Sequence, residues 1–220
     1  MAKKAGKSFA SGIDFYKLFW VFMIGCFLGV VVETLYCLLT NGYIQSRQGL
    51  IYGPFNPVYG FGAVLMTLVL HPIAHRKWYI IFVLGMVLGG GFEFISSFVQ
   101  QATTGTVSWQ YHQMPFNIGG RTSLQYSFYW GALSLLWVKE IYPLMSKLIE
   151  KIPRNMGVPL TWLLVVFMVF NMTISALAVN RWNERIQGIP ASGGFEQFLD
   201  STYPNNFMDQ IYPNMVHVGH

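Results

Sequence analysis

Five long apolar runs, separated by shorter polar stretches, dominate the chain. They cover approximately residues 16–39, 58–74, 78–99, 123–141 and 159–179. A helix needs roughly 20 mostly apolar residues to cross a bilayer, and several of these runs approach or exceed that length. The pattern predicts an all-α membrane protein with five transmembrane helices.

A motif in the first run recurs in the third, sixty residues later. The spacing Gly-x-x-x-Gly-x-x-x-Glu occupies residues 25–33 and again 85–93. A polar loop follows each copy and contains Pro-Phe-Asn, at 54–56 and at 115–117. We interpret this as a duplicated unit of helix, outer loop and helix. Because each unit has two spans, the chain returns to the same side, which predicts two parallel repeats.

The remaining segments follow from this division. Apolar and basic side chains separate onto two sides of 143–157, which is typical of a helix lying on the membrane surface. The aromatic C-terminal tail is expected to pack over the outer face as a lid or buttress. The expected organisation is a cytoplasmic segment 1–15, repeats 16–76 and 77–142, an inner interfacial helix 143–157, a fifth span 158–181 and an outer tail 182–220.

Composition and charge support the membrane class. Of 220 residues, 53% are hydrophobic and only 10% are charged, whereas soluble domains carry about a quarter. The net charge of +5 does not indicate nucleic acid, because the basic residues cluster by position. They gather before the first span and in the connections 75–77 and 139–154, so the positive-inside rule predicts a cytoplasmic N-terminus and an external C-terminus in the cell membrane.

The repeated motif places each glutamate on a packing face. Glycines at four-residue spacing let helices approach closely in lipid, and Glu33 and Glu93 continue the same faces. An ionised group near mid-bilayer costs roughly 2.5–3.5 kcal/mol on insertion scales, so each carboxyl must be protonated, paired or hydrated. Glu33 lies near the end of its span, and we expect Glu93 to lie deeper.

Two interpretations of these glutamates remain open. Either Arg47 and Arg121, in the outer loops, pair with them structurally across the repeats, or the charges line a polar cavity that opens outward between the repeats. Arginine forks and aromatic faces suit an anionic or aromatic ligand or a lipid headgroup. The candidate binding residues are Glu33, Glu93, Arg47, Arg121, Asn56, Asn117, Tyr59, Trp109 and Tyr111. The outer loops either enter the protein partway or cap the helix ends.

Other kinds of site find little support. His112 with the two glutamates would make a weak metal site, and no phosphate-binding loop or catalytic triad pattern is present. We therefore expect no metal and no cofactor, and nothing identifies an enzyme.

Several motifs resemble those of the type IV ABC-transporter permease family (CmpB-like). They are Arg47-Gln-Gly49, Tyr52-Gly-Pro-Phe-Asn-Pro-Val-Tyr-Gly60, Trp109-Gln-Tyr111, Gly120-Arg121, Trp130-Gly131, Arg181-Trp182-x-x-Arg185 and Phe198-Leu-Asp200. The chain has Gln110 where the family commonly has aspartate. The resemblance implies a transport permease whose energy comes from a separate cytoplasmic ATPase.

Three functions are consistent with these observations. The first is a permease or substrate-capture subunit with an outward-facing polar site between the repeats, binding a small molecule or lipid. The second is a membrane-embedded enzyme or lipid-handling protein that uses Glu93 as acid or base. The third is a non-catalytic membrane scaffold.

Overall fold

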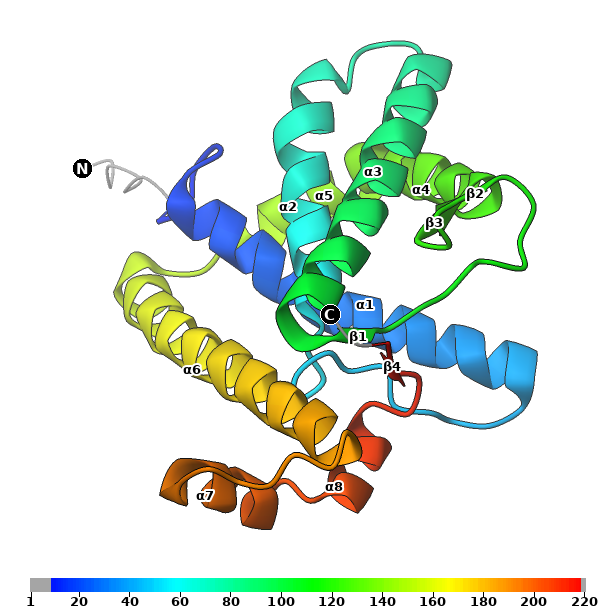
Figure 1. The fold of residues 1–220 in the computed structure, drawn as a ribbon. Helices are drawn as coiled ribbons and strands as arrows, with labels where there is room; N and C mark the ends of the chain where they lie inside the picture. The colour runs from blue at the N-terminus through cyan, green and yellow to red at the C-terminus, as the bar shows by residue number, and fades with distance from the viewer. Residues whose placement is uncertain (1–8, 219–220) are drawn as a thin grey trace.

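The computed structural model describes residues 9–218 as an almost entirely helical chain (Figure 1). Residues 1–8, with three of the lysines used to predict orientation, lie outside the described residues. The helices are α1 (Phe15–Asn41), α2 (Pro57–Leu70), α3 (Trp78–Thr104), α4 (Leu124–Leu136), α5 (Tyr142–Glu150), α6 (Arg154–Ile186), α7 (Gly194–Thr202) and α8 (Asn205–Ile211). A 3₁₀ turn, η1 (His71–Ile73), and a π-helical turn, η2 (Trp137–Ile141), supplement them. Four two-residue strands form two small antiparallel pairs: β1 (Thr106–Val107) with β4 (Val216–His217), and β2 (Asn117–Ile118) with β3 (Thr122–Ser123).

Local chemistry sets the ends of the two long helices that carry the repeated motif. Asp14 caps α1 by accepting a hydrogen bond from the backbone nitrogen of Lys17 at 2.8 Å. Gly42 (φ 78°) follows α1 and Gly105 (φ 64°) follows α3, both in the left-handed conformation that glycine adopts without steric cost. Each outer loop therefore starts at a glycine.

Three helices, α1, α3 and α6, have the length and composition to cross a membrane. The helical membrane class is therefore confirmed. The second and fourth predicted spans differ from single membrane-spanning helices. The α2 helix has 14 residues, and at 1.5 Å per residue it is shorter than a bilayer core of about 30 Å. The α4, η2 and α5 elements follow one another without a break from 124 to 150, so Pro143 does not separate a surface helix from the preceding span.

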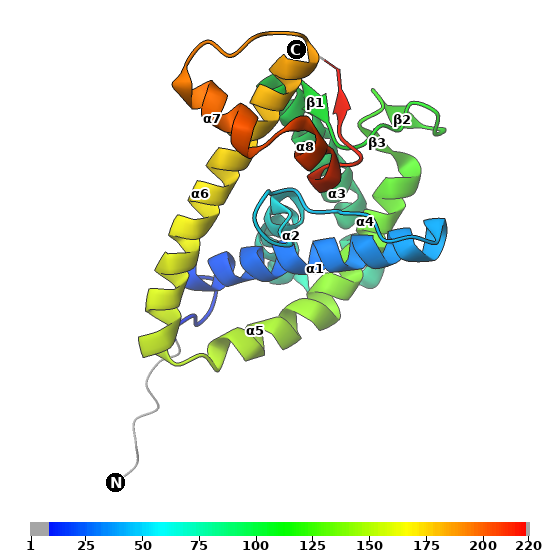
Figure 2. The ribbon, with the colours of Figure 1, turned by 90° about the horizontal axis from the view of Figure 1, so that it is seen from below.

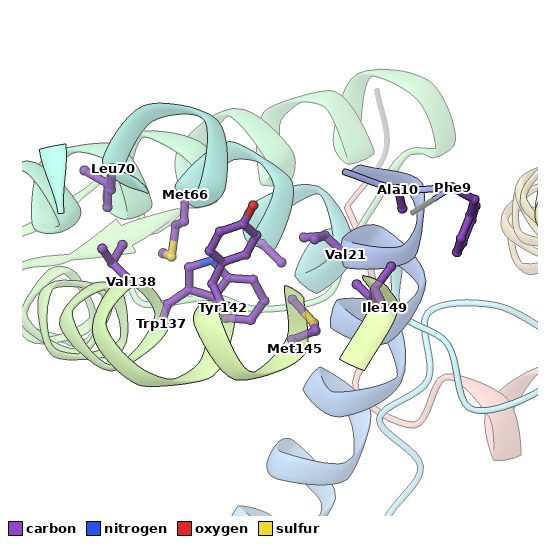
Figure 3. Packing of buried hydrophobic residues seen from close by; sticks show 11 residues of the cluster. Phe9, Ala10, Val21, Met66, Leu70, Trp137, Val138, Tyr142, Met145 and Ile149 are labelled. Carbon is purple, nitrogen blue, oxygen red and sulfur yellow. The ribbon is translucent and has the colours of Figure 1, made fainter. Parts of the chain in front are cut away.

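The long helices cross one another rather than forming a parallel bundle (Figures 1 and 2). Within this arrangement α1 packs mainly against α2, and α3 mainly against α4. One end of the assembly is held by a buried apolar cluster in which Val21 of α1 and Met66 and Leu70 of α2 meet Trp137, Tyr142 and Met145 (Figure 3). The Trp137 indole donates a hydrogen bond to Thr67 at 3.0 Å, which satisfies both buried polar groups.

The buried cation Lys17 also lies at this end. Its side chain is fully buried, and its ammonium lies 2.5 Å from Glu150 Oε1 and 2.5 Å from Ser146 Oγ. The start of α1 is thereby joined to α5.

The opposite end is covered by the C-terminal tail. Arg181, near the end of α6, is buried and donates two hydrogen bonds to Asp200 of α7, at 2.9 and 3.0 Å. Tyr203 then pairs with Tyr52 of the first outer loop at 2.7 Å, while β4 pairs with β1 in the second. The tail therefore joins α6 to both outer loops.

The first outer loop folds back to the middle of α1. Its Leu50 is buried beside Cys26, and the Asn56 backbone nitrogen donates to the Cys26 carbonyl at 3.1 Å. Asn171 of α6 holds the loop through both backbone groups of Tyr52, at 3.1 and 2.7 Å.

Candidate functional site

The two glycines of each repeated motif form a notch for the following helix. A Cβ on Gly25 would lie 2.8 Å from Ala63, and a Cβ on Gly29 would lie 2.2 Å from Tyr59. In the second copy, Gly85 and Gly89 take the same places against Ser134 and Trp130, at 2.3 Å each. Small residues are therefore required because the neighbouring helix occupies the space that any side chain would need.

Glu33 lies one turn beyond the first notch. Tyr59 donates a hydrogen bond to its Oε2, and Arg47 Nη1 lies 3.5 Å from its Oε1. The side chains of Arg47 and Glu33 are 17% and 29% exposed, so this ion pair is partly buried and partly accessible to solvent. The pairing of Glu33 with Arg47 lies within the first repeat, not across the repeats.

Glu93 lies one turn beyond the second notch but has different partners. It is 6% exposed, the more buried of the two glutamates. Tyr111 donates to its Oε1 at 2.9 Å and Thr122 donates to its Oε2 at 2.8 Å, and the Trp130 side chain lies beside the carboxyl group. No cation of residues 9–218 forms a salt bridge with Glu93. The carboxyl is held by neutral donors, and Arg121 is not its partner.

The two carboxyl groups share a polar, aromatic neighbourhood. Tyr59 interacts electrostatically with both Glu33 and Glu93. Tyr111 stacks on Tyr126 of α4, with ring centroids 4.3 Å apart. Direct contacts join Glu33 to Tyr59 in the first helix pair and Glu93 to Tyr111 in the second, and α2 packs against α3 between the two pairs.

Arg121 lies elsewhere, beside the C-terminal half of α3. Its guanidinium donates to Ser97 at 3.0 Å and to Gln101, and it lies 5.6 Å from the centre of the Phe98 ring. A cavity of about 300 Å³ opens here, and Trp109 and His112 are among its walls. Arg121 and Trp109 therefore belong to a second location, separate from the glutamates.

The two predicted asparagines hydrogen-bond within the loops themselves. Asn56 caps α2 by accepting from Val58, and its amide donates to the Arg47 carbonyl. Asn117 accepts from the Gly120 backbone at 2.9 Å and donates to Met114 at 2.8 Å. Both side chains fix loop shape.

Sequence reasoning missed several residues that complete these sites. Thr122 and Trp130 reach Glu93, Tyr126 stacks on Tyr111, and Ser97 and Gln101 hold Arg121. Trp130 had a signal, because Trp130-Gly131 follows the second motif as Tyr59-Gly60 follows the first. The others had none, because Ser97 and Gln101 are isolated polar residues within α3, and Thr122 and Tyr126 lie where α4 begins, outside the repeated motif. Within residues 9–218 no group of three His, Cys, Asp or Glu side chains is placed to hold a metal ion.

Comparison with known proteins gives one match. A family model described as "Putative ABC-transporter type IV" matches residues 20–176, which include both repeated motifs and both outer loops. No curated protein and no solved structure matches the chain. The match covers more than half of the chain, so the protein belongs to this ABC-transporter-type family of multi-pass membrane proteins.

Proposed function

We propose that the protein is the permease or substrate-capture subunit of a transporter in the cell membrane. In this proposal two parallel repeats, 16–76 and 77–142, and a fifth span form the membrane part. The N-terminus is cytoplasmic, the tail is external, and a separate ATPase supplies energy.

One observation carries the proposal: two neighbouring helix pairs each hold a glutamate one turn beyond a glycine notch, Glu33 partly buried and Glu93 buried. Neither carboxyl lies on a lipid-facing side, because each follows the glycine notch that packs against a partner helix. Keeping such groups within a membrane is costly, and intramembrane ionisable residues characteristically mark substrate or ion pathways. The position of Tyr59, within electrostatic reach of both glutamates, supports a single polar site between the repeats.

The unequal partners of the glutamates suggest different roles within that site. Glu33 has a cation, Arg47, whereas the donors to Glu93 among residues 9–218 are neutral. A carboxyl group without a cation is the one whose charge a passing ligand or proton would neutralise. In this proposal Glu93 is the residue that responds to the ligand, and Glu33 with Arg47 fixes the first outer loop.

The test is isolation of the native assembly. The tagged chain is purified in mild detergent from its own cells, and an unrelated tagged multi-pass protein serves as the control. The proposal predicts that an ATP-hydrolysing subunit with a phosphate-binding loop copurifies with this chain alone. A chain that purifies without an ATPase, and whose deletion leaves uptake unchanged, would contradict the proposal.

A structural role is the second candidate, favoured by the hydrogen bonds that Glu93 accepts from Tyr111 and Thr122. Glu93→Gln separates the two functions, because the amide retains the size of the side chain but cannot accept a full set of donors. Loss of function at an unchanged melting temperature supports the site. Collapse of the fold supports the scaffold.

A further inference from the structure

We propose that Arg121 forms a binding site for a small anion, carrying a carboxylate or phosphate group, in the cavity between the end of α3 and the second outer loop. This inference rests on the proposed function, since the cavity lies beside the outer loops through which a captured ligand would enter.

The charge of the cavity walls favours an anion. Arg121 lines both the 300 Å³ cavity and an adjacent hollow of about 190 Å³ near Phe98. No acidic residue of the described part of the chain is among the walls of either space. A cavity whose only charged wall residue is an arginine has a positive potential, which favours an anion.

Arg121 has no acidic counter-ion among the residues that the structure describes. Arg47, Arg181 and Arg185 each form a salt bridge with a carboxylate. Arg121 forms none with any of residues 9–218, where its side-chain hydrogen bonds go to the neutral groups of Ser97 and Gln101. These two bonds use one N–H on each terminal nitrogen, and a guanidinium has five N–H donors in a planar fork. The unused donors match the geometry of a carboxylate or phosphate.

Arg121 is held rigidly by its neighbours. The Trp109 indole donates to the Arg121 carbonyl at 2.8 Å, and the Arg121 backbone nitrogen donates to Ile118 at 3.1 Å. Gly120 (φ 67°) precedes it and fits against the His112 ring, where a Cβ would lie 2.4 Å from the imidazole. Backbone and side chain are both fixed before a ligand arrives, which reduces the entropic cost of binding.

Size and lining narrow the ligand class. About 300 Å³ is at the lower limit for small-molecule pockets, so the cavity suits a small organic anion or a single headgroup. Trp109 and His112 offer ring surfaces, and Val107 and Val218 add apolar contacts. Val218 follows β4, so the C-terminal tail supplies part of the wall.

Binding to the purified full-length chain tests this inference. Sodium benzoate and inorganic phosphate are the soluble probes, and nanodiscs with or without phosphatidylglycerol test an anionic headgroup. We expect at least one probe to raise the melting temperature of the wild-type protein. Arg121→Gln should weaken that binding roughly ten- to hundred-fold, because charged hydrogen bonds are lost.

The controls separate charge from geometry. Arg76→Gln removes the same charge from the exposed connection between α2 and α3 and should leave binding unchanged. Arg121→Lys retains the charge without the fork and should bind about tenfold more weakly than wild type; it also serves if Arg121→Gln does not fold.

Binding of benzoate or phosphate indicates a soluble anion, and a response to phosphatidylglycerol alone indicates a headgroup; both support the site. No response to any probe, or a response that Arg121→Gln retains, would overturn it. Copurification of an ATPase does not depend on Arg121. If an ATPase copurifies but no anion binds, only the anion site is contradicted. If an anion binds but no ATPase copurifies, only the proposed permease is contradicted.

Discussion

Tyr59 and Trp130 occupy equivalent places in the two helix pairs. Each ring fills the notch of the second glycine of the motif, Gly29 for Tyr59 and Gly89 for Trp130. Tyr59 also donates a hydrogen bond to Glu33, one turn further along α1, and the Trp130 side chain lies beside Glu93 at the same place on α3. In both pairs the ring that packs against the glycine is therefore also a neighbour of the glutamate.

The notch should be sensitive to a single methyl group. In Gly89→Ala the new Cβ would lie 2.3 Å from the Trp130 ring, and overpacking of this kind costs about 1–3 kcal/mol. Gly91→Ala, on the open side of the same helix with nothing within 4 Å, should be neutral or stabilising by up to about 1 kcal/mol. Thermal unfolding of both variants in detergent checks the difference. Equal melting temperatures would show that the notch is not tight.

Asn171 should control the first outer loop. Its amide bonds both backbone groups of Tyr52, so Asn171→Leu leaves those groups without partners, at about 1–3 kcal/mol. We expect faster amide hydrogen exchange across residues 48–55. Thr173→Val is the control, because the Thr173 hydroxyl bonds only the carbonyl of Val169 in its own helix. Unchanged exchange in Asn171→Leu would mean that other contacts hold the loop.

Attachment of the tail should depend on pH through Asp200. The hydrogen bond from Arg181 lowers the pKa of Asp200 below its ordinary value of about 3.9. Because the pKa of Asp200 is lower in the folded protein than in the unfolded chain, the Arg181–Asp200 pair stabilises the fold fully above about pH 4. This stabilisation is lost as the pH falls through the folded-state pKa of Asp200. Limited proteolysis with an acid-active protease should release the tail only in that acidic range. Cleavage that is independent of pH between 5 and 2 would contradict this linkage.

Removing the charge at Asp200 should loosen the C-terminal tail at neutral pH, as acid does in the wild type. Asp200→Asn takes one carboxylate from the 3%-exposed Arg181, which keeps its ion pair with Glu184 at 2.9 Å. The loss should be about 1.5–3 kcal/mol, the range for a hydrogen bond to a charged group. Asp209→Asn changes an exposed carboxylate in α8 and should leave the tail attached. Tail protection under proteolysis compares the two variants.

Orientation can be tested by cysteine labelling. Both native cysteines, Cys26 and Cys37, are free and buried, so they should react slowly. Ser192→Cys in the tail and Arg76→Cys between α2 and α3 both replace exposed residues. In intact cells a membrane-impermeant maleimide should label Ser192→Cys and not Arg76→Cys. The opposite result would invert the proposed topology.

The sequence predicted the parts of the fold that depend on local pattern. Glycines at four-residue spacing identified the packing faces of α1 and α3, and the structure confirms that Gly25, Gly29, Gly85 and Gly89 contact the following helix. These contacts follow from helical periodicity alone, which is why they could be predicted.

The loop contacts could not be predicted in the same way. The position of Arg121 depends on the path of residues 105–123, which Asn117 and Gly120 set through hydrogen bonds and a left-handed backbone. Charge alone favoured a pair with Glu93, but the loop places the guanidinium against Ser97 and Gln101. The partners of Glu93 include Thr122 and Trp130, whose approach depends on where α4 begins.

The central claim is that the protein holds a ligand in a polar site that includes Glu93, and native mass spectrometry tests it most directly. Wild-type protein and Glu93→Gln are purified side by side in mild detergent, with Gly91→Ala as a folded control. The account predicts a copurifying small molecule or lipid on the wild type and on Gly91→Ala that is lost from a folded Glu93→Gln. Identical bound masses on all three proteins, or none on any of them, would contradict it.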